Sequence, residues 1–91
     1  MSRIQTQGTT TAYGSALTLL ASTTQVEVSF LDSGALVAGT VKVIDPQANE
    51  VEIPISADQS YIFNLAFGTS DGWTVKLKAG ADTPTGQLLE T

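Results

Sequence analysis

The sequence predicts a small all-β protein, an antiparallel β-sandwich or barrel of about six to seven strands with an extended N-terminal arm. Three observations predict this fold. Short runs of alternating apolar and polar residues recur along the chain, and a period of two is typical of half-buried strands. Turn-forming residues separate the runs at the roughly 8–12-residue spacing of sandwiches and barrels. The 91 residues suffice for one domain with one modest core.

The N-terminal segment, residues 1–12, reads MSRIQTQGTTTA and is almost entirely polar, with Ile4 as its only sizeable apolar side chain after Met1. We expect an extended arm here, ahead of a single β domain that spans residues 13–91. A polar terminal segment is mobile unless something holds it. Two interpretations are open: another chain holds the arm, or the arm adds a strand to the domain's own sheet.

The next runs differ in clarity. Tyr13–Ala21 fits one face of a short helix, but its brevity and its Thr/Ser-rich flanks favour a strand. Gln25–Leu31 is a clear strand with Val26, Val28 and Phe30 facing inward. At the C-terminus, Gln87–Thr91 could add a last short strand.

A hairpin is predicted from the alternating run Leu36–Ile44, the turn at Asp45–Asn49 and a second run that begins at Glu50. Pro54 cannot donate a ladder hydrogen bond, which suggests an edge strand. The predicted register pairs Val43 with Val51, Val41 with Ile53, and Lys42 with Glu52.

A second hairpin is predicted over Tyr61–Lys78, where two alternating runs flank the turn formers Gly68–Gly72. Most of the aromatic residues would then lie on one side of it, which indicates core. Its predicted register pairs Phe67 with Trp73, Leu65 with Val75, and Phe63 with Leu77.

The charge argues against nucleic acid as a partner. Nine acids outweigh four cations, for a formal net charge of −5. Nucleic-acid binding relies on clustered cations that displace the counterions of phosphates, and this chain has no such cluster.

Catalytic residues are also missing. The chain contains neither His nor Cys, which excludes Ser–His and Cys–His nucleophilic systems and removes the usual ligands of zinc and iron. The acids fall in turns and at outward strand positions, where solvated acids normally lie, and not as a catalytic pair. We expect a protein that is not an enzyme and has no cofactor.

Calcium is the one metal worth weighing, because it binds carboxylate, amide and carbonyl oxygens. Asp45 with Asn49 and Glu50, or Asp71 with Asp32, would supply such oxygens. No closely alternating Asp/Asn spacing is present, however, and Asp and Asn are favoured in turns in their own right. The turn interpretation is preferred, and we expect no metal site.

The start of the chain shows no apolar signal core, and the apolar run Ala16–Ala21 is too short to cross a bilayer, which takes about 20 residues. We therefore expect no signal peptide, no transmembrane segment and no membrane partner. The lack of Cys favours folding in a reducing cytoplasm.

In overall character the chain resembles small all-β virion proteins of tailed bacteriophages, of the capsid decoration or cement type. The likeness lies in the charge-poor, Thr/Ser/Ala-rich β chain, the polar arm and the missing signal peptide, and not in a motif. It implies a structural protein of the virion, assembled in the host cytoplasm, that binds itself, with a trimer favoured, and a capsid protein. Residues 1–12 and 80–91 would lie across neighbouring subunits, and many weak contacts would add up over the lattice.

A second interpretation is an immunoglobulin-like binding or adhesion module of a phage fibre or bacterial surface protein. The stretch DPQANEVEIPISADQSYIFNL has the turn-and-strand rhythm of such modules. Its binding surface would lie in the loops Asp32–Ala35, Pro46–Asn49 or Gly68–Gly72, because loops on a rigid scaffold commonly carry recognition.

Partner contacts are expected from the arm, from the tyrosine least constrained by the strand pattern, and from outward apolar positions. An outward apolar residue is covered either by a partner or by a second sheet. For Ile62 the sequence favours the second sheet, and for the other outward apolar positions both remain open. The predicted contact residues are Arg3, Ile4, Tyr13, Leu36 and Ile44.

Overall fold

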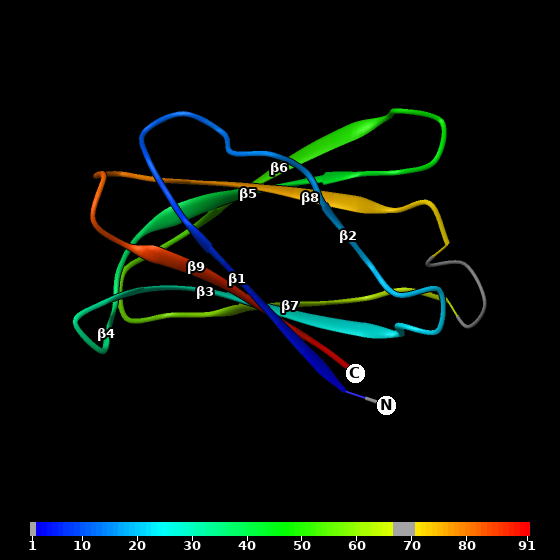
Figure 1. Cartoon of the computed structure of the whole chain (residues 1–91), viewed down its shortest axis with the longest axis horizontal. Coiled ribbons are helices and arrows are strands. Elements are labelled where there is room, and N and C mark those ends of the chain that lie inside the picture. Colours follow the sequence, from blue (N-terminus) through cyan, green and yellow to red (C-terminus); the bar gives the residue numbers. More distant parts are fainter. Residues whose placement is uncertain (1, 67–70) are drawn as a thin grey trace.

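The structure is a computed structural model that describes residues 2–66 and 71–91, and these residues form nine β-strands and no helix (Figure 1). The predicted all-β class is therefore confirmed, with more strands than expected because two of them contain only two residues. The strands are β1 (Arg3–Gly8), β2 (Leu17–Thr18), β3 (Gln25–Asp32), β4 (Ala35–Leu36), β5 (Gly39–Ile44), β6 (Glu50–Ile55), β7 (Tyr61–Asn64), β8 (Thr74–Ala79) and β9 (Thr85–Glu90).

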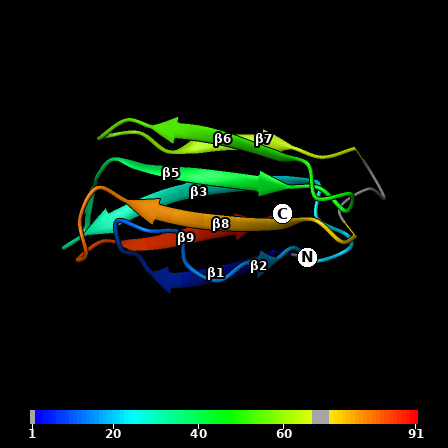
Figure 2. The ribbon, with the colours of Figure 1, turned by 90° about the horizontal axis from the view of Figure 1, so that it is seen from above.

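The strands form two antiparallel sheets. In sheet A, β9 lies between β1 and β3, and both β7 and β4 pair with the other edge of β3. Sheet B has the order β2-β8-β5-β6. Seen from above, β6 lies over β7, β5 over β3, β8 over β9, and β2 over β1 (Figure 2). The fold is a sandwich of two sheets and not a single closed barrel.

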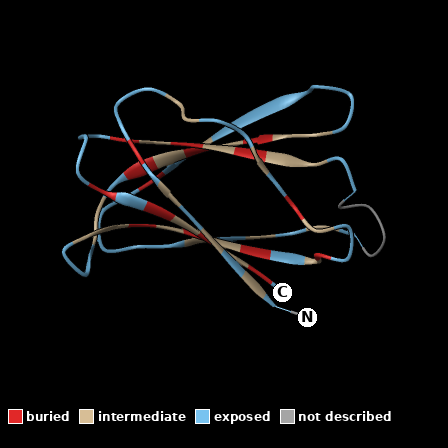
Figure 3. Ribbon diagram, viewed as in Figure 1, coloured by how far each residue is buried: buried red, intermediate tan, exposed pale blue. Residues whose placement is uncertain are grey.

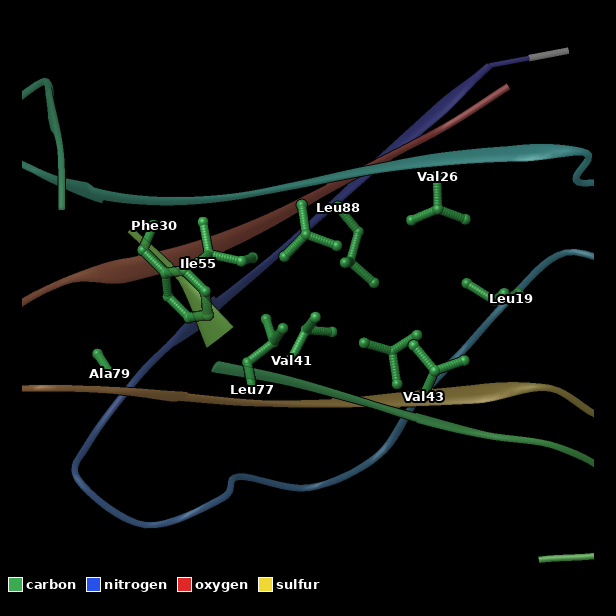
Figure 4. Packing of buried hydrophobic residues seen from close by; sticks show 11 residues of the cluster. Leu19, Val26, Phe30, Val41, Val43, Ile55, Leu77, Ala79 and Leu88 are labelled. Atoms are coloured by element: carbon green, nitrogen blue, oxygen red, sulfur yellow. The ribbon is translucent and has the colours of Figure 1, made fainter. Parts of the chain in front are cut away.

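The core lies between the sheets and is built from the inward residue of each alternating pair. Val26, Val28 and Phe30 of β3 are fully buried, as the sequence predicted. They meet the inward residues of β5, β8 and β9 (Figure 4). Along these strands buried residues alternate mostly with half-buried ones (Figure 3). The remaining buried apolar residues are Leu19, Val41, Val43, Ile55, Val75, Leu77, Ala79 and Leu88.

The hairpin of β5 and β6 confirms one predicted register in full. Val43 pairs with Val51, Val41 with Ile53 and Lys42 with Glu52. The Asp45 carboxylate forms the turn between the strands, since its Oδ1 accepts hydrogen bonds from the backbone N–H groups of residues 47 and 49, both at 2.9 Å. β6, which contains the proline, is an edge strand as predicted.

The predicted hairpin over Tyr61–Lys78 is wrong. β7 pairs with β3 in sheet A, whereas β8 pairs with β5 and β2 in sheet B, so the segment between them crosses from one sheet to the other. Val75 lies opposite Leu17 and Val43, and not opposite Leu65. The alternation was interpreted correctly, because the inward residues of both runs pack on the core. The pairing of Phe67 lies outside the described residues.

The run Leu36–Ile44 was predicted as one strand, but it also changes sheet. β4 pairs with the end of β3 in sheet A, and β5 starts in sheet B after a two-residue break. Gly39, the first residue of β5, packs against a buried aromatic ring, and a Cβ built there would lie 2.4 Å from Phe30 Cδ2. Any side chain at this crossing would displace the core.

Both termini belong to sheet A. Of the two interpretations of the N-terminal arm, the structure shows a strand in the domain's own sheet: β1 is extended and pairs along its whole length with β9. The run from Tyr13 contains only the two-residue strand β2, and no helix. The C-terminal segment, expected as an optional short strand, forms β9, which has strand partners on both sides.

Candidate functional site: the outer face of sheet A

The outer face of sheet A is the broadest surface to which strands distant in sequence contribute together. Ladder pairing places residues of four strands in common rows, and rows that alternate with the buried ones point to solvent. Three outward rows cross at least three strands: Ile4–Leu89–Glu27–Ile62, Thr6–Gln87–Ser29, and Gly8–Thr85–Leu31–Leu36.

Apolar side chains recur on this face. Ile4 is 59% exposed and Ile62 is 50% exposed, at opposite edges of the sheet. Leu89, Leu31 and Leu36 are half-buried between and beside them. The expectation that a second sheet covers Ile62 is wrong, because its pairing with Glu27 aims it away from sheet B. Two predicted contact residues, Ile4 and Leu36, thus share one face, although 32 positions separate them in sequence.

Charge is nearly absent from the same face. Glu27 is the one ionisable side chain in the three outward rows of described residues, and its Oε2 accepts a hydrogen bond from Ser60 Oγ at 2.8 Å. The other polar members are hydroxyl and amide side chains. Covering such a surface removes little charge from water, so the desolvation penalty of packing against it is small.

The outer face of sheet B has the opposite character. Lys42, Lys76 and Lys78 project from β5 and β8, and two of them lie against the ring of Tyr13: Lys42 Nζ is 4.4 Å and Lys78 Nζ 4.7 Å from its centroid. The tyrosine hydroxyl donates a hydrogen bond to Glu52 on β6. Burial, together with this bond and the nearby carboxylates, raises the pKa of Tyr13 to about 12.

Two predicted contact residues, Tyr13 and Ile44, lie on this second face. Ile44 is half-buried and lies in register between Glu50 and Thr74. The Lys42 ammonium forms a 3.4 Å salt bridge with Glu50 beside it. These two residues are therefore on the opposite side of the sandwich from Ile4 and Leu36, and the structure does not bring the predicted contacts into one site.

The fifth predicted contact residue, Arg3, points inward and binds Glu90 in the next strand. Glu90 is 1% exposed, and both of its oxygens are fully bonded. Oε2 accepts from Arg3 Nε at 2.7 Å and from Gln5 Nε2 at 2.9 Å. Oε1 accepts from Leu20 N at 2.8 Å and from Thr23 Oγ1 at 3.0 Å. Arg3 is thus a structural residue and not a free contact.

The environment of Glu90 shifts its pKa downward. Burial alone raises the pKa of a carboxyl, but the hydrogen bonds from Arg3, Leu20, Gln5 and Thr23 favour the ionised form and outweigh it, so the pKa lies below its ordinary value. The sequence analysis missed this site. A signal was present, because Glu90 follows Leu88 by two residues and so shares the inward face of its strand.

The candidate calcium ligands do not converge. Both Asp45 oxygens already accept hydrogen bonds within their own turn, which lower the pKa of this carboxyl, chiefly through the 2.9 Å bond from Asn49 Nδ2 to Oδ2. The end of β3, which carries Asp32, and the turn before β8, which carries Asp71, lie at opposite ends of the sandwich (Figure 1). Within the described residues, no group of three or more acidic side chains could hold a metal ion.

The loops of the alternative interpretation lie at two ends of the sandwich. Asp32–Ala35 lies at one end of the sandwich and Pro46–Asn49 at the other (Figure 1). Most of the third loop, Gly68–Gly72, lies outside the described residues. At least the first two therefore cannot form one continuous binding surface.

Comparison with known proteins gives no match to a family model, a curated protein or a solved structure. The part of the chain that the structure describes contains no helix that could cross a membrane.

Proposed function

We propose that this protein is a non-enzymatic structural protein of the head of a tailed phage, a capsid decoration or cement protein. The observation that carries the proposal is the outer face of sheet A, which is almost uncharged and on which the side chains of Ile4 and Ile62 are exposed. Its partners would be further copies of the chain, as a trimer, and a capsid protein.

This face is of moderate size. The two sheets are stacked along the intermediate axis of the 35 × 25 × 18 Å molecule (Figures 1 and 2), so the outer face of sheet A measures about 35 × 18 Å, an area somewhat below the about 800 Å² per partner that a standard protein interface buries. Exposed apolar patches on small soluble proteins commonly mark interaction sites.

The structure changes the expected mechanism of attachment. Residues 3–8 and 85–90 are paired strands of the domain, and so these residues contribute to the face instead of reaching across neighbouring subunits as free arms. Deleting residues 2–12 would remove Arg3 and expose Glu90, and so would test folding more than attachment. Substitutions on the surface test attachment directly.

The decisive experiment compares the wild type with the double variant Ile4→Lys/Ile62→Lys. We expect the wild type to have a native mass above its 9.5 kDa monomer and to sediment with expanded phage capsids. The double variant should stay folded, because both residues are exposed, but be monomeric and fail to sediment. Gln47→Lys, at an exposed residue of the turn between β5 and β6 in sheet B, is the control and should behave as wild type. A monomeric wild type that ignores capsids would exclude the proposal.

A further inference from the structure

The two long sides of the sandwich differ: hydrogen bonds bridge one, and a groove runs along the other. On the side of β1 and β2, polar side chains of β1 reach across to carbonyl groups beyond sheet A. Arg3 Nη2 and Gln5 Nε2 donate to Thr18 O at 2.8 and 3.0 Å, and Gln7 Nε2 donates to Ser15 O at 3.0 Å. This side is held shut by hydrogen bonds.

Among the described residues, the opposite side, between β6 and β7, is open and apolar. A groove of about 230 Å³ lies there, which we call the β6–β7 groove, with Val51, Ile53, Phe63, Leu65 and Trp73 among its lining residues. Val51 shows that no other described residue covers the groove at this point. Its register partner Val43 is buried and so aims it toward the interior, yet Val51 is 60% exposed. Most of β6 is exposed in the same way (Figure 3).

Both strands that flank the groove have a free edge. Among the described residues, β6 pairs only with β5, and β7 pairs only with β3. An unpaired edge is a template for an added strand. Pro54 removes one backbone donor from β6, whereas β7 contains no proline, so the edge of β7 is the better template.

The charges at the groove indicate which kind of peptide segment is complementary to it. Its described lining contains Asp45 and no Lys or Arg. The turn that carries Asp71 lies at the same end, because a Cβ on neighbouring Gly72 would be 3.2 Å from Pro46 Cγ. This end of the groove is therefore acidic, and a segment with cations is complementary to it.

A second copy of the chain cannot supply such a segment. Its one cation on an edge strand is Arg3, which is bonded to Glu90 and to Thr18 O. Its lysines project from β5 and β8, which have strand partners on both sides within sheet B. Free cations next to an unpaired apolar strand must come from another protein.

We propose that the β6–β7 groove binds an extended segment of another protein in which apolar residues alternate with Lys or Arg. The segment pairs with the free edge of β7, places apolar side chains between Val51 and Trp73, and brings a cation to the end of the groove that carries Asp45. This inference is independent of the proposed assembly through sheet A.

The test uses three synthetic peptides: acetylated Lys-Val-Lys-Val-Lys-Val-Lys, the same peptide with Glu in place of Lys, and the basic peptide N-methylated at alternate residues. Trp73, the one tryptophan of the chain, reports binding by its fluorescence, and amide NMR shifts locate it. We expect saturable binding of the basic peptide with shifts along β6 and β7, and binding at least about tenfold weaker for both other peptides.

Variants provide a matched pair. Val51→Thr should weaken binding of the basic peptide about tenfold, because it places a hydroxyl among apolar side chains. Ile4→Thr, at an equally exposed residue on the face of sheet A, should leave it unchanged. The proposal is overturned if the basic and acidic peptides bind equally, if the shifts lie elsewhere, or if no binding occurs at ~1 mM peptide. The proposal is also overturned if the free protein self-associates through the β6–β7 groove, so that the groove is already covered before any peptide is added.

Discussion

Arg3 and Glu90, which are 87 positions apart in the chain, lie in one row of sheet A with the guanidinium Nε 2.7 Å from a carboxylate oxygen. This contact joins the first strand to the last. It also places a carboxylate inside the sandwich, where Leu20 and Thr23 of the link between β2 and β3 donate to its second oxygen. One side chain therefore connects three segments of the fold.

Replacing this carboxylate by an amide should destabilise the protein. In Glu90→Gln the amide –NH₂ must face groups that are themselves donors, so at least one of the four hydrogen bonds is lost and the charge of Arg3 is left without its partner. We expect a loss of about 2–4 kcal/mol in the free energy of unfolding, measured by urea denaturation. Glu27→Gln, on the outer face of the same sheet, is the control and should change stability by less than about 0.5 kcal/mol.

The same residue should make stability depend on pH. Because the pKa of Glu90 is lower in the folded state, the unfolded chain binds more protons in the acid range. Its stabilising contribution is fully present above the ordinary pKa near 4.5 and is lost as the pH falls through the depressed value. Urea titrations at about pH 6.5 and at about pH 3 should show a stability difference between wild type and Glu90→Gln that shrinks at the lower pH. A difference independent of pH would contradict this assignment.

The close contact at Gly39 predicts a second destabilising change. In Gly39→Ala the new methyl group would lie 2.4 Å from Phe30 Cδ2, and Phe30 is fully buried, so the ring or the strand must move. We expect a loss of about 1–3 kcal/mol in thermal or urea unfolding. Gly8→Ala is the strand control: no atom lies within 4 Å of the added Cβ, and stability should be unchanged or slightly higher.

Tyr13 offers a test on the other face. Its raised pKa, about 12, means that the folded protein favours the neutral phenol. The associated stability is present below pH 10, the ordinary tyrosine value, and is lost as the pH rises through about 12. An absorbance titration of the wild type should show one tyrosine that ionises at a higher pH than an ordinary tyrosine, and this transition should be missing in Tyr13→Phe. The variant keeps the ring over Lys42 and loses only the hydrogen bond to Glu52, so it should be less stable by about 1 kcal/mol or less at neutral pH.

Much of the local structure could be predicted from the sequence. The β5–β6 register follows from two alternating runs and a short Asp-Pro turn, because strands that are close in sequence have few ways to pair. The same logic failed for Tyr61–Lys78. Alternation shows which residues face the core but not which sheet a strand joins, and turn formers occur in crossovers between sheets as well as in hairpins.

Features that depend on strands distant in sequence could not be predicted from the alternation of residues. In β1 the inward residues are Arg3, Gln5 and Gln7, and Ile4 is among the exposed ones, so the usual rule that apolar residues face the core is reversed. That reversal makes sense only once the carboxylate of Glu90 and the carbonyl of Thr18 are known to lie opposite. Of the candidate face, the sequence could predict that Ile4 and Leu36 are outward, but not that one sheet presents both.

The position of β9 between β1 and β3 has a consequence for how the chain is made. Translation runs from the N-terminus, so residues 3–8 are synthesised long before residues 85–90, the only strand with which β1 pairs among the described residues. Until then β1 lacks its ladder and β3 lacks one neighbour. Sheet A can therefore close only after its last strand has left the ribosome, and the nascent chain remains open to chaperones and proteases through most of its synthesis.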